Sequence, residues 1–235
     1  MKLSRRSFCA CAIGAPLFAR PAFAQQATAC DVLTPERQSL KTPDEAIQRL
    51  KDGNRRFVEG HTVNCDLMAQ AHQTATYQSP AAAIVGCIDS RVPPELVFDQ
   101  GIGDVFTARI AGNFVNTDIL GSLEFATRVS GAKAVVVLGH TSCGAITSAM
   151  AGVELGNITG LLANIAPALP AATAGGGTLD PADASQVAAV TAANVRLAVE
   201  AVTARSDIMR AMVEAGDLKV AGAVHDLATG EVAWL

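Results

Sequence analysis

Residues 134–144 read AVVVLGHTSCG, and they set the architecture of this 235-residue chain. The first five of these residues are apolar, and the three consecutive valines, residues 135–137, have β-branched side chains that favour a strand buried on both faces. Gly139 ends the apolar run, and His140 and Cys143 come directly after it. Ligand-binding side chains in that place are typical of a parallel α/β sheet, in which ligands collect outside the carboxyl ends of the strands.

Four further apolar runs predict the other strands, at residues 82–86, 105–109, 218–224 and 231–235. Short buried strands separated by helical stretches indicate a mainly parallel sheet with helices on both faces. The turn at residues 228–230 is too short for a crossover, so we expect the last strand to be antiparallel. The predicted fold class is therefore α/β, with four parallel strands, a C-terminal antiparallel strand and an N-terminal helical arm.

Capping residues and apolar periodicity predict the helices. Thr42 and Glu45 form a capping box at the start of the N-terminal arm, which ends near Gly60. In the longest of the later helices, Asn194 is assigned to the polar side, and residues 170–184 before that helix form a small-residue loop. The later helices are expected at residues 117–129, 185–205 and 207–215.

The chain divides into three parts by composition. Residues 1–24 are a predicted signal peptide, residues 25–41 a polar, irregular leader, and residues 42–235 one globular domain. Half of the residues in the whole chain are hydrophobic, which is enough for a full core. The net charge is −4 and there is no basic stripe, so we expect no nucleic-acid partner.

The first 24 residues have the pattern of an export signal. Arg5 and Arg6 precede an apolar run of about twelve residues, and Ala22-Phe23-Ala24 is a cleavage site of the small-x-small form. Paired arginines at this place resemble a twin-arginine signal, which is read by machinery that exports folded proteins. A spanning helix needs about twenty apolar residues. We therefore expect cleavage after Ala24, a periplasmic or otherwise exported protein that folds before export, and no stable membrane anchor.

Cys87, His140 and Cys143 form a candidate zinc site. Cys87 and His140 each follow a predicted strand, so they converge if those strands are neighbours. His140 and Cys143 are three residues apart, which brings both to one side of a turn that opens into a helix. Two sulfurs and one imidazole suit zinc. With no second Cys-x-x-Cys motif to close the site, three protein ligands and an open position indicate a catalytic zinc ion.

Asp89 and Arg91 lie two and four residues beyond Cys87. A carboxylate so close to the metal can take the fourth coordination position and close the site, or it can pair with Arg91 and leave that position to water. In the second state Asp89 accepts a hydrogen bond from zinc-bound hydroxide. We favour the second state as the resting one. Asp89 is then a fourth ligand only in a closed form of the site.

Four cysteines remain after the signal is removed, and they have conflicting requirements. Exported proteins often contain disulfides, whereas zinc binding at Cys87 and Cys143 needs free thiolates. Export of the folded protein resolves the conflict, because zinc can be inserted in the reducing cytoplasm before export. For Cys30 and Cys65 two alternatives stay open. They form a disulfide, or they are two free thiols without a role in the site.

The pattern Cys-x-Asp-x-Arg, followed about fifty residues later by His-x-x-Cys, resembles the β-class carbonic anhydrases. The resemblance implies that Cys87, His140 and Cys143 bind one zinc ion per subunit, that Asp89 and Arg91 are a catalytic dyad, and that Gln78 donates a hydrogen bond to the substrate. It extends from about residue 42 to the C-terminus and includes residues 53–57, 78–80, 91–95, 98–100, 103–106, 109, 111–113, 122–124 and 139–144.

This resemblance implies an enzyme that reversibly hydrates carbon dioxide to bicarbonate and a proton, by attack of zinc-bound hydroxide. One alternative is a hydrolase of a sulfur analogue of CO2, such as carbonyl sulfide, carbon disulfide or thiocyanate. Another is a non-catalytic zinc- or bicarbonate-binding protein. The resemblance also implies a homodimer or a dimer of dimers, with the active-site cleft at the subunit interface and the N-terminal helix around the partner.

Overall fold

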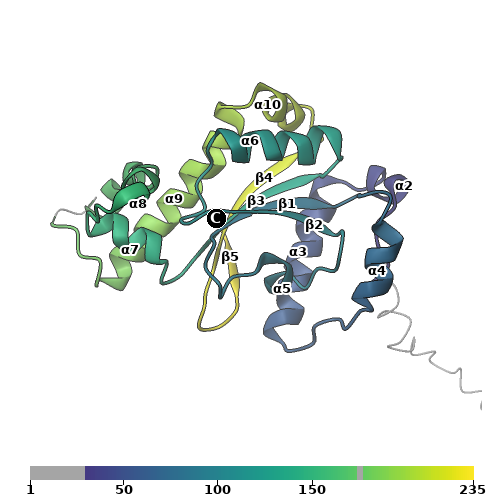
Figure 1. The fold of residues 1–235 in the computed structure, drawn as a ribbon, viewed down its shortest axis with the longest axis horizontal. Helices are drawn as coiled ribbons and strands as arrows, with labels where there is room; N and C mark the ends of the chain where they lie inside the picture. The colour runs from purple at the N-terminus through teal and green to yellow at the C-terminus, as the bar shows by residue number, and fades with distance from the viewer. Residues whose placement is uncertain (1–29, 174–176) are drawn as a thin grey trace, which may run out of the picture.

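The computed structural model describes residues 30–173 and 177–235, so the signal predicted at residues 1–24 lies outside the described residues. A five-stranded sheet in the order β2-β1-β3-β4-β5 forms the centre of the molecule (Figure 1). Strands β1 to β4 are parallel and β5 is antiparallel to β4, which confirms the predicted fold class. The strands are β1 (Ala82–Gly86), β2 (Val105–Arg109), β3 (Ala134–His140), β4 (Lys219–His225) and β5 (Val232–Trp234).

The central strands β1 and β3 are buried along their whole length. They are neighbours, and Gly86 pairs with Leu138, so both strands end at the same edge of the sheet. Successive side chains point to opposite faces, and Ile84 and Val85 accordingly belong to two different core clusters. Because both faces are apolar, both must be covered.

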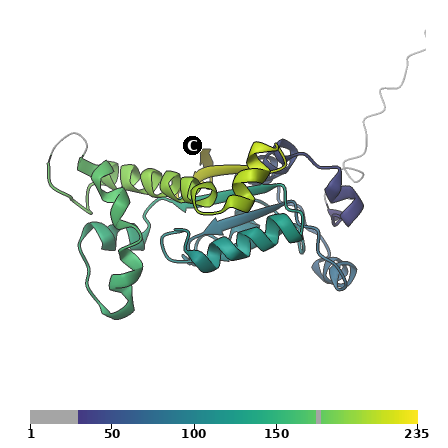
Figure 2. The same ribbon diagram turned by 90° about the horizontal axis from the view of Figure 1, so that it is seen from above.

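Helices cover the two faces of the sheet (Figures 1 and 2). On one face Leu50 and Phe98 are fully buried between the sheet and the helices α3 (Pro43–Val58) and α5 (Pro94–Val97). On the other face Val202 and Met209 pack with the sheet and with α6. The helices of that face are α6 (Thr117–Glu124), α9 (Ala184–Ala204) and α10 (Asp207–Glu214).

A third group of elements projects beyond the carboxyl ends of the strands (Figure 1). Apolar side chains from this group, together with Val187 and Val190 of α9, enclose Cys87 and Cys143 in a separate core cluster. The thiols therefore lie in an apolar environment at the edge of the sheet. The group consists of α7 (Gly144–Met150), α8 (Gly156–Leu162) and the 3-10 helix η2 (Ala166–Thr173).

Several elements differ from the sequence-based expectations. The N-terminal arm α3 has the predicted capping box, but the leader expected to be irregular contains the short helix α2 (Pro35–Ser39), and α4 (Leu67–Thr74) was not predicted. The helix expected over residues 117–129 is α6 followed by a π-helix, η1 (Phe125–Val129). Residues 170–173 of the expected loop belong to η2.

Helix α9 corrects one prediction about a side chain. Asn194, assigned to the polar side of the helix, is only 3% exposed. The helix is long and apolar enough to cross a membrane by length and composition. It lies along the sheet, however, with Val195, Ala198 and Val202 in the core, so its apolar character is accounted for by packing.

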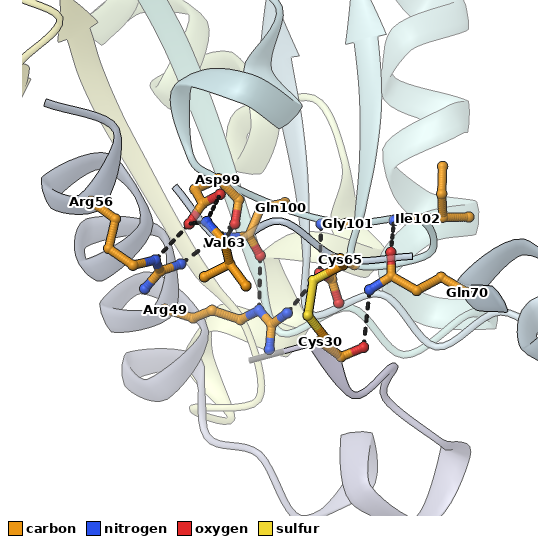
Figure 3. Close-up of a disulfide and its surroundings, with 11 residues drawn as sticks. Cys30, Arg49, Arg56, Val63, Cys65, Gln70, Asp99, Gln100, Gly101 and Ile102 are labelled. Carbon is orange, nitrogen blue, oxygen red and sulfur yellow. Dashed lines mark hydrogen bonds and ion pairs between the residues drawn. A yellow bond between two sulfur atoms is a disulfide. The ribbon is translucent and has the colours of Figure 1, made fainter. Parts of the chain in front are cut away.

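A disulfide between Cys30 and Cys65 joins the start of the described chain to the segment before α4 (Figure 3). Gln70 of α4 donates a hydrogen bond to the Cys30 carbonyl at 3.0 Å and accepts one from the Ile102 N–H at 3.0 Å. The two alternatives that the sequence left open for these cysteines are thus decided in favour of the disulfide. The bond ties the N-terminal segment to the segment before α4, and Gln70 links both to the loop that leads into β2.

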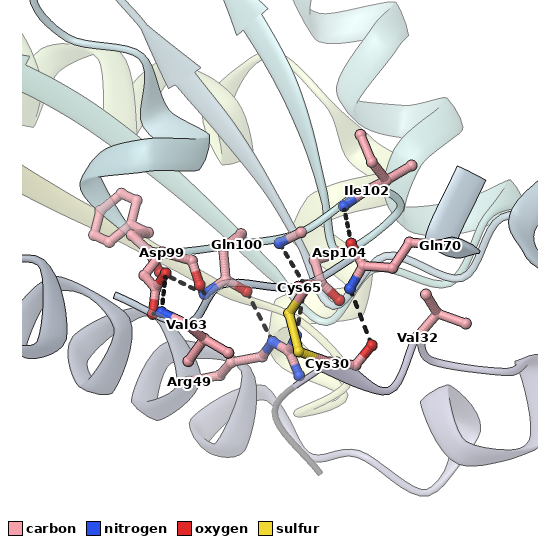
Figure 4. A network of polar contacts seen from close by, with 12 residues as sticks. Cys30, Val32, Arg49, Val63, Cys65, Gln70, Asp99, Gln100, Ile102 and Asp104 are labelled. Carbon is pink, nitrogen blue, oxygen red and sulfur yellow. Dashed lines mark hydrogen bonds and ion pairs between the residues drawn. A yellow bond between two sulfur atoms is a disulfide. The ribbon is translucent and has the colours of Figure 1, made fainter. Parts of the chain in front are cut away.

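Two ion pairs hold the same loop to α3, that of Arg49 in Figure 4 and that of Arg56 in Figure 3. Arg49 pairs with the buried carboxylate of Asp104 at 2.7 Å and donates to Gln100 at 2.8 Å. Arg56 pairs with Asp99, five residues before Asp104. We call this set, together with the disulfide, the amino-end network, since it lies where β2 begins.

Candidate metal centre

The carboxyl ends of β1 and β3 bring together the three predicted zinc ligands. Cys87 follows β1, His140 ends β3, and Cys143 is the residue before the first turn of α7. The potential ligand atoms of these three residues all lie within 4.8 Å of one another. Sequence reasoning expected this convergence, and it depends on β1 and β3 being neighbours.

All three side chains are buried, and both thiols are free. The Nδ1 atom of His140 lies 2.9 Å from the Thr141 carbonyl oxygen. In the tautomer protonated at Nδ1, this nitrogen donates a hydrogen bond to that oxygen. This leaves His140 Nε2 as a buried atom without a hydrogen-bond partner in the described structure. A buried imidazole nitrogen fixed by a carbonyl behind it and facing two thiols fits a metal ion, and the soft donor set suits zinc.

The pKa values of the three side chains in this cluster are shifted in different directions. A hydrogen bond from the Cys143 thiol lowers the pKa of Cys87 to about 4, although burial acts in the opposite direction. The same hydrogen bond, together with burial, raises the pKa of Cys143. Burial opposes protonation of His140, but the nearby Cys87 sulfur and the Thr141 carbonyl outweigh that effect and raise its pKa. Without a metal, the pair of sulfurs therefore shares one negative charge.

Asp89 and Arg91 form a bidentate pair beside the cluster. Arg91 Nε lies 2.9 Å from Asp89 Oδ1, and its terminal nitrogen lies 2.7 Å from Asp89 Oδ2. These hydrogen bonds hold the pKa of Asp89 well below its usual range, and they raise the pKa of Arg91. Asp89 Oδ2 also lies 3.9 Å from His140 Nε2. The carboxylate is thus adjacent to the cluster, with both of its oxygens occupied by the guanidinium.

Arg109 is a residue of the site whose role sequence reasoning did not identify. It ends β2, and its guanidinium donates to the carbonyls of Cys87 at 2.9 Å and Asp89 at 2.6 Å. Arg91 makes a similar link to the second loop through the Ser142 carbonyl at 3.3 Å. The sequence signal that could have identified Arg109 is its place at the end of a predicted strand, because the carboxyl ends of parallel strands lie together.

Gln78 is not brought to the cluster within one chain. It is exposed and precedes β1, whereas Cys87 follows β1. A strand of five residues is about 16 Å long. Gln78 and the ligands therefore lie at opposite ends of the same strand.

Comparison with known proteins gives one consistent result. A sequence profile of the family described as carbonic anhydrase matches residues 82–232, from β1 to β5. Carbonic anhydrase 2 of Mycobacterium tuberculosis is 34% identical over 195 residues, which cover 80% of this chain and 90% of the relative. The carbonic anhydrase of Mycolicibacterium smegmatis is also 34% identical, over 81% of this chain and 92% of the relative.

Solved structures agree with the sequence relatives. The β-carbonic anhydrase CafA of Aspergillus fumigatus has 28% identity and a TM-score of 0.64, over 82% of this chain and 89% of that one. A structure from a study of two tetrameric β-carbonic anhydrases of Sordaria macrospora has 26% identity and a TM-score of 0.61, over 72% of this chain and 90% of that one. The residues matched by the family profile include Cys87, His140 and Cys143.

Proposed function

This chain belongs to the β-class carbonic anhydrase family, and we propose that it catalyses the reversible hydration of carbon dioxide to bicarbonate and a proton. The observation that carries the proposal is the cluster of Cys87, His140 and Cys143, whose ligand atoms lie within 4.8 Å of one another. The bidentate pairing of Asp89 beside it favours a site that remains open to substrate.

One zinc ion per subunit would be held by the two sulfurs and by His140 Nε2. When bound, such an ion lowers the pKa of a water ligand towards neutrality and so supplies a nucleophile for CO2. The protein contributes the ligand geometry: the Thr141 carbonyl orients His140, and burial of the cluster keeps bulk water from the thiolates.

Asp89 is the proposed hydrogen-bond acceptor next to that position. Arg91 keeps the carboxylate ionised, and Asp89 Oδ2 lies near enough to the ligand cluster to accept a hydrogen bond from a water held there. To act instead as a fourth metal ligand in a closed state, Asp89 would have to give up at least one hydrogen bond to Arg91. We therefore propose that the resting site at neutral pH is the open one.

Stopped-flow CO2 hydration over a range of pH, with zinc measured in the same samples, tests this function. We expect turnover in proportion to zinc content. Parallel assays with carbonyl sulfide, carbon disulfide and thiocyanate distinguish the sulfur-analogue alternative, which predicts faster turnover of one of those compounds than of CO2. A protein that binds zinc stoichiometrically and turns over none of these substrates would be a zinc- or bicarbonate-binding protein instead.

A homodimer, or a dimer of dimers, is also proposed. Gln78 can act on substrate only if a second copy brings it to the cluster of the first. The edge strand β2 supports such an assembly, because a groove beside it is lined by Phe106 and Phe125, and Phe125 is 49% exposed. The mass of the purified protein, measured by analytical ultracentrifugation, tests the assembly.

Export by the twin-arginine route remains a proposal that rests on residues 1–24. The disulfide between Cys30 and Cys65 supports an oxidising destination, since disulfides persist in such compartments. Cell fractionation and the N-terminal sequence of the mature protein test it. We expect a periplasmic protein that begins at Gln25.

A further inference from the structure

Asn194 is a buried polar residue that the proposed chemistry does not use. It lies in the middle of α9, and its Nδ2 atom donates a hydrogen bond to the Gly112 carbonyl at 2.8 Å. The N–H of Gly112 in turn donates to the sulfur of Cys87 at 3.4 Å. A chain of two hydrogen bonds therefore connects the helix to one of the proposed metal ligands.

The turn around Gly112 requires a glycine. Its φ is +80°, and a Cβ at this position would lie 2.5 Å from Ile165 Cδ1. The next residue, Asn113, also has a positive φ, of 43°. Glycine adopts a positive φ without steric penalty. For the same reason, the backbone of Gly112 does little to keep its N–H pointing in one direction.

The peptide that follows Gly112 is held at both ends. Its carbonyl accepts from Asn194, and its N–H, which belongs to Asn113, donates to the Ile110 carbonyl at 3.0 Å. These two contacts fix the plane of that peptide and so restrict the backbone rotation of Gly112, whose own N–H lies in the preceding peptide. The direction of the Gly112 N–H towards Cys87 thus depends on a side chain that lies 82 residues further along the chain.

We propose that Asn194 is a positioning residue of the metal centre, which directs the Gly112 N–H at the Cys87 sulfur and so tunes how strongly that thiolate binds the metal. The inference rests on the proposed metal centre. A hydrogen bond to a thiolate is charge-assisted, and it withdraws electron density that the sulfur would otherwise donate to the metal. Partners of this kind also orient the ligand, and their loss typically weakens metal affinity about 10- to 100-fold.

The variant Asn194→Leu keeps the approximate volume of the side chain and removes the donor. In the cobalt-substituted full chain, we expect the sulfur-to-cobalt charge-transfer band to move to lower energy, because the thiolate is more electron-rich. Competition with a chelator is expected to show zinc affinity reduced about tenfold. Neither readout depends on catalytic activity.

Asn54→Leu is the matched control. Asn54 is also a buried helical asparagine, and it donates to the backbone carbonyls of Val97 at 3.1 Å and Gly230 at 2.9 Å. Its loss lowers stability for the same physical reason, but none of its hydrogen bonds leads to a metal ligand. We expect its cobalt spectrum and zinc affinity to match those of the unmodified protein.

Two outcomes would count against the inference, and a second variant keeps the test possible. If Asn194→Leu does not fold, Asn194→Ala, which needs no extra room, is measured in its place. A folded Asn194 variant whose cobalt band and zinc affinity equal those of Asn54→Leu overturns the inference and leaves the proposed function standing. An unmodified protein that binds neither cobalt nor zinc overturns the proposed function and the inference together.

Discussion

The two pairs of cysteines in the described chain lie near opposite ends of the sheet and have opposite chemistry. Cys30 and Cys65 are half-buried on loops near the start of β2, and they form a disulfide. Cys87 and Cys143 are buried at the carboxyl ends of β1 and β3, and they are free. The role of each cysteine therefore follows from its surroundings: the first pair joins segments of chain, and the second faces an imidazole.

The surroundings of the two pairs differ in a way that explains this. The disulfide lies within the amino-end network, whose carboxylates are paired with Arg49 and Arg56 and hold backbone segments together. At the other end, the free thiols converge with His140 on one small volume, and a backbone N–H points at one of the sulfurs. A metal ion fits only the second arrangement.

Removal of one metal ligand should have the largest effect. Cys143→Ser is expected to lower zinc content to near zero and CO2 hydration to the uncatalysed background, because two remaining ligands do not hold a catalytic ion. Cys65→Ser, the matched change at the other pair, should retain both zinc and activity. Equal zinc loss in the two variants would contradict the contrast between the pairs.

Removal of the disulfide should affect stability and not the metal. A closed loop of 35 residues contributes about 3–4 kcal/mol through the lost entropy of the unfolded chain. We expect Cys30→Ser to lower the free energy of unfolding by that amount in denaturant titrations under oxidising conditions. With a reductant present, the unmodified protein should unfold at the same denaturant concentration as the variant. A stability that does not respond to reductant would show that the bond contributes nothing.

The dyad should have an intermediate effect on turnover. Asp89→Ala removes the carboxylate that Arg91 holds beside the cluster, and we expect turnover to fall about 10- to 100-fold with zinc retained. Arg91→Ala should act in the same direction. Asp207→Ala, which breaks an exposed pair with Arg210 on α10, is the control and should leave turnover unchanged. Full activity in Asp89→Ala would remove the dyad from the mechanism.

The smallest effect concerns the charge of the free pair. Since the pKa of Cys87 is lowered to about 4 and that of Cys143 is raised, the metal-free protein should contain about one thiolate at pH 7. Its ultraviolet absorbance should disappear as the pH falls through about 4, which is the direction required by a lowered pKa. In Cys143→Ala the donor is lost, so the transition should move to higher pH. An unchanged transition would mean that Cys143 does not stabilise the thiolate.

Local patterns predicted much of the fold. The bounds of β1 and β2 agree with the apolar runs in the sequence, and the capping box of α3 is present, because these features depend on residues close together in the chain. Helix α4 was missed because its eight residues show little amphipathic pattern. The π-helix η1 was missed because a helix of that kind has no distinct apolar period in so short a segment.

The chemistry of the metal centre can be read from the order of residues: two thiols and an imidazole after buried strands, with a carboxylate and a guanidinium two and four residues beyond the first thiol. Which distant groups meet depends on how the elements pack. This packing paired Cys30 with Cys65, turned Asn194 inward to Gly112, and separated Gln78 from the cluster by the length of β1. The physical reason is that residue type and periodicity act over a few neighbouring positions, whereas these contacts join elements whose proximity follows from the packing of the whole sheet.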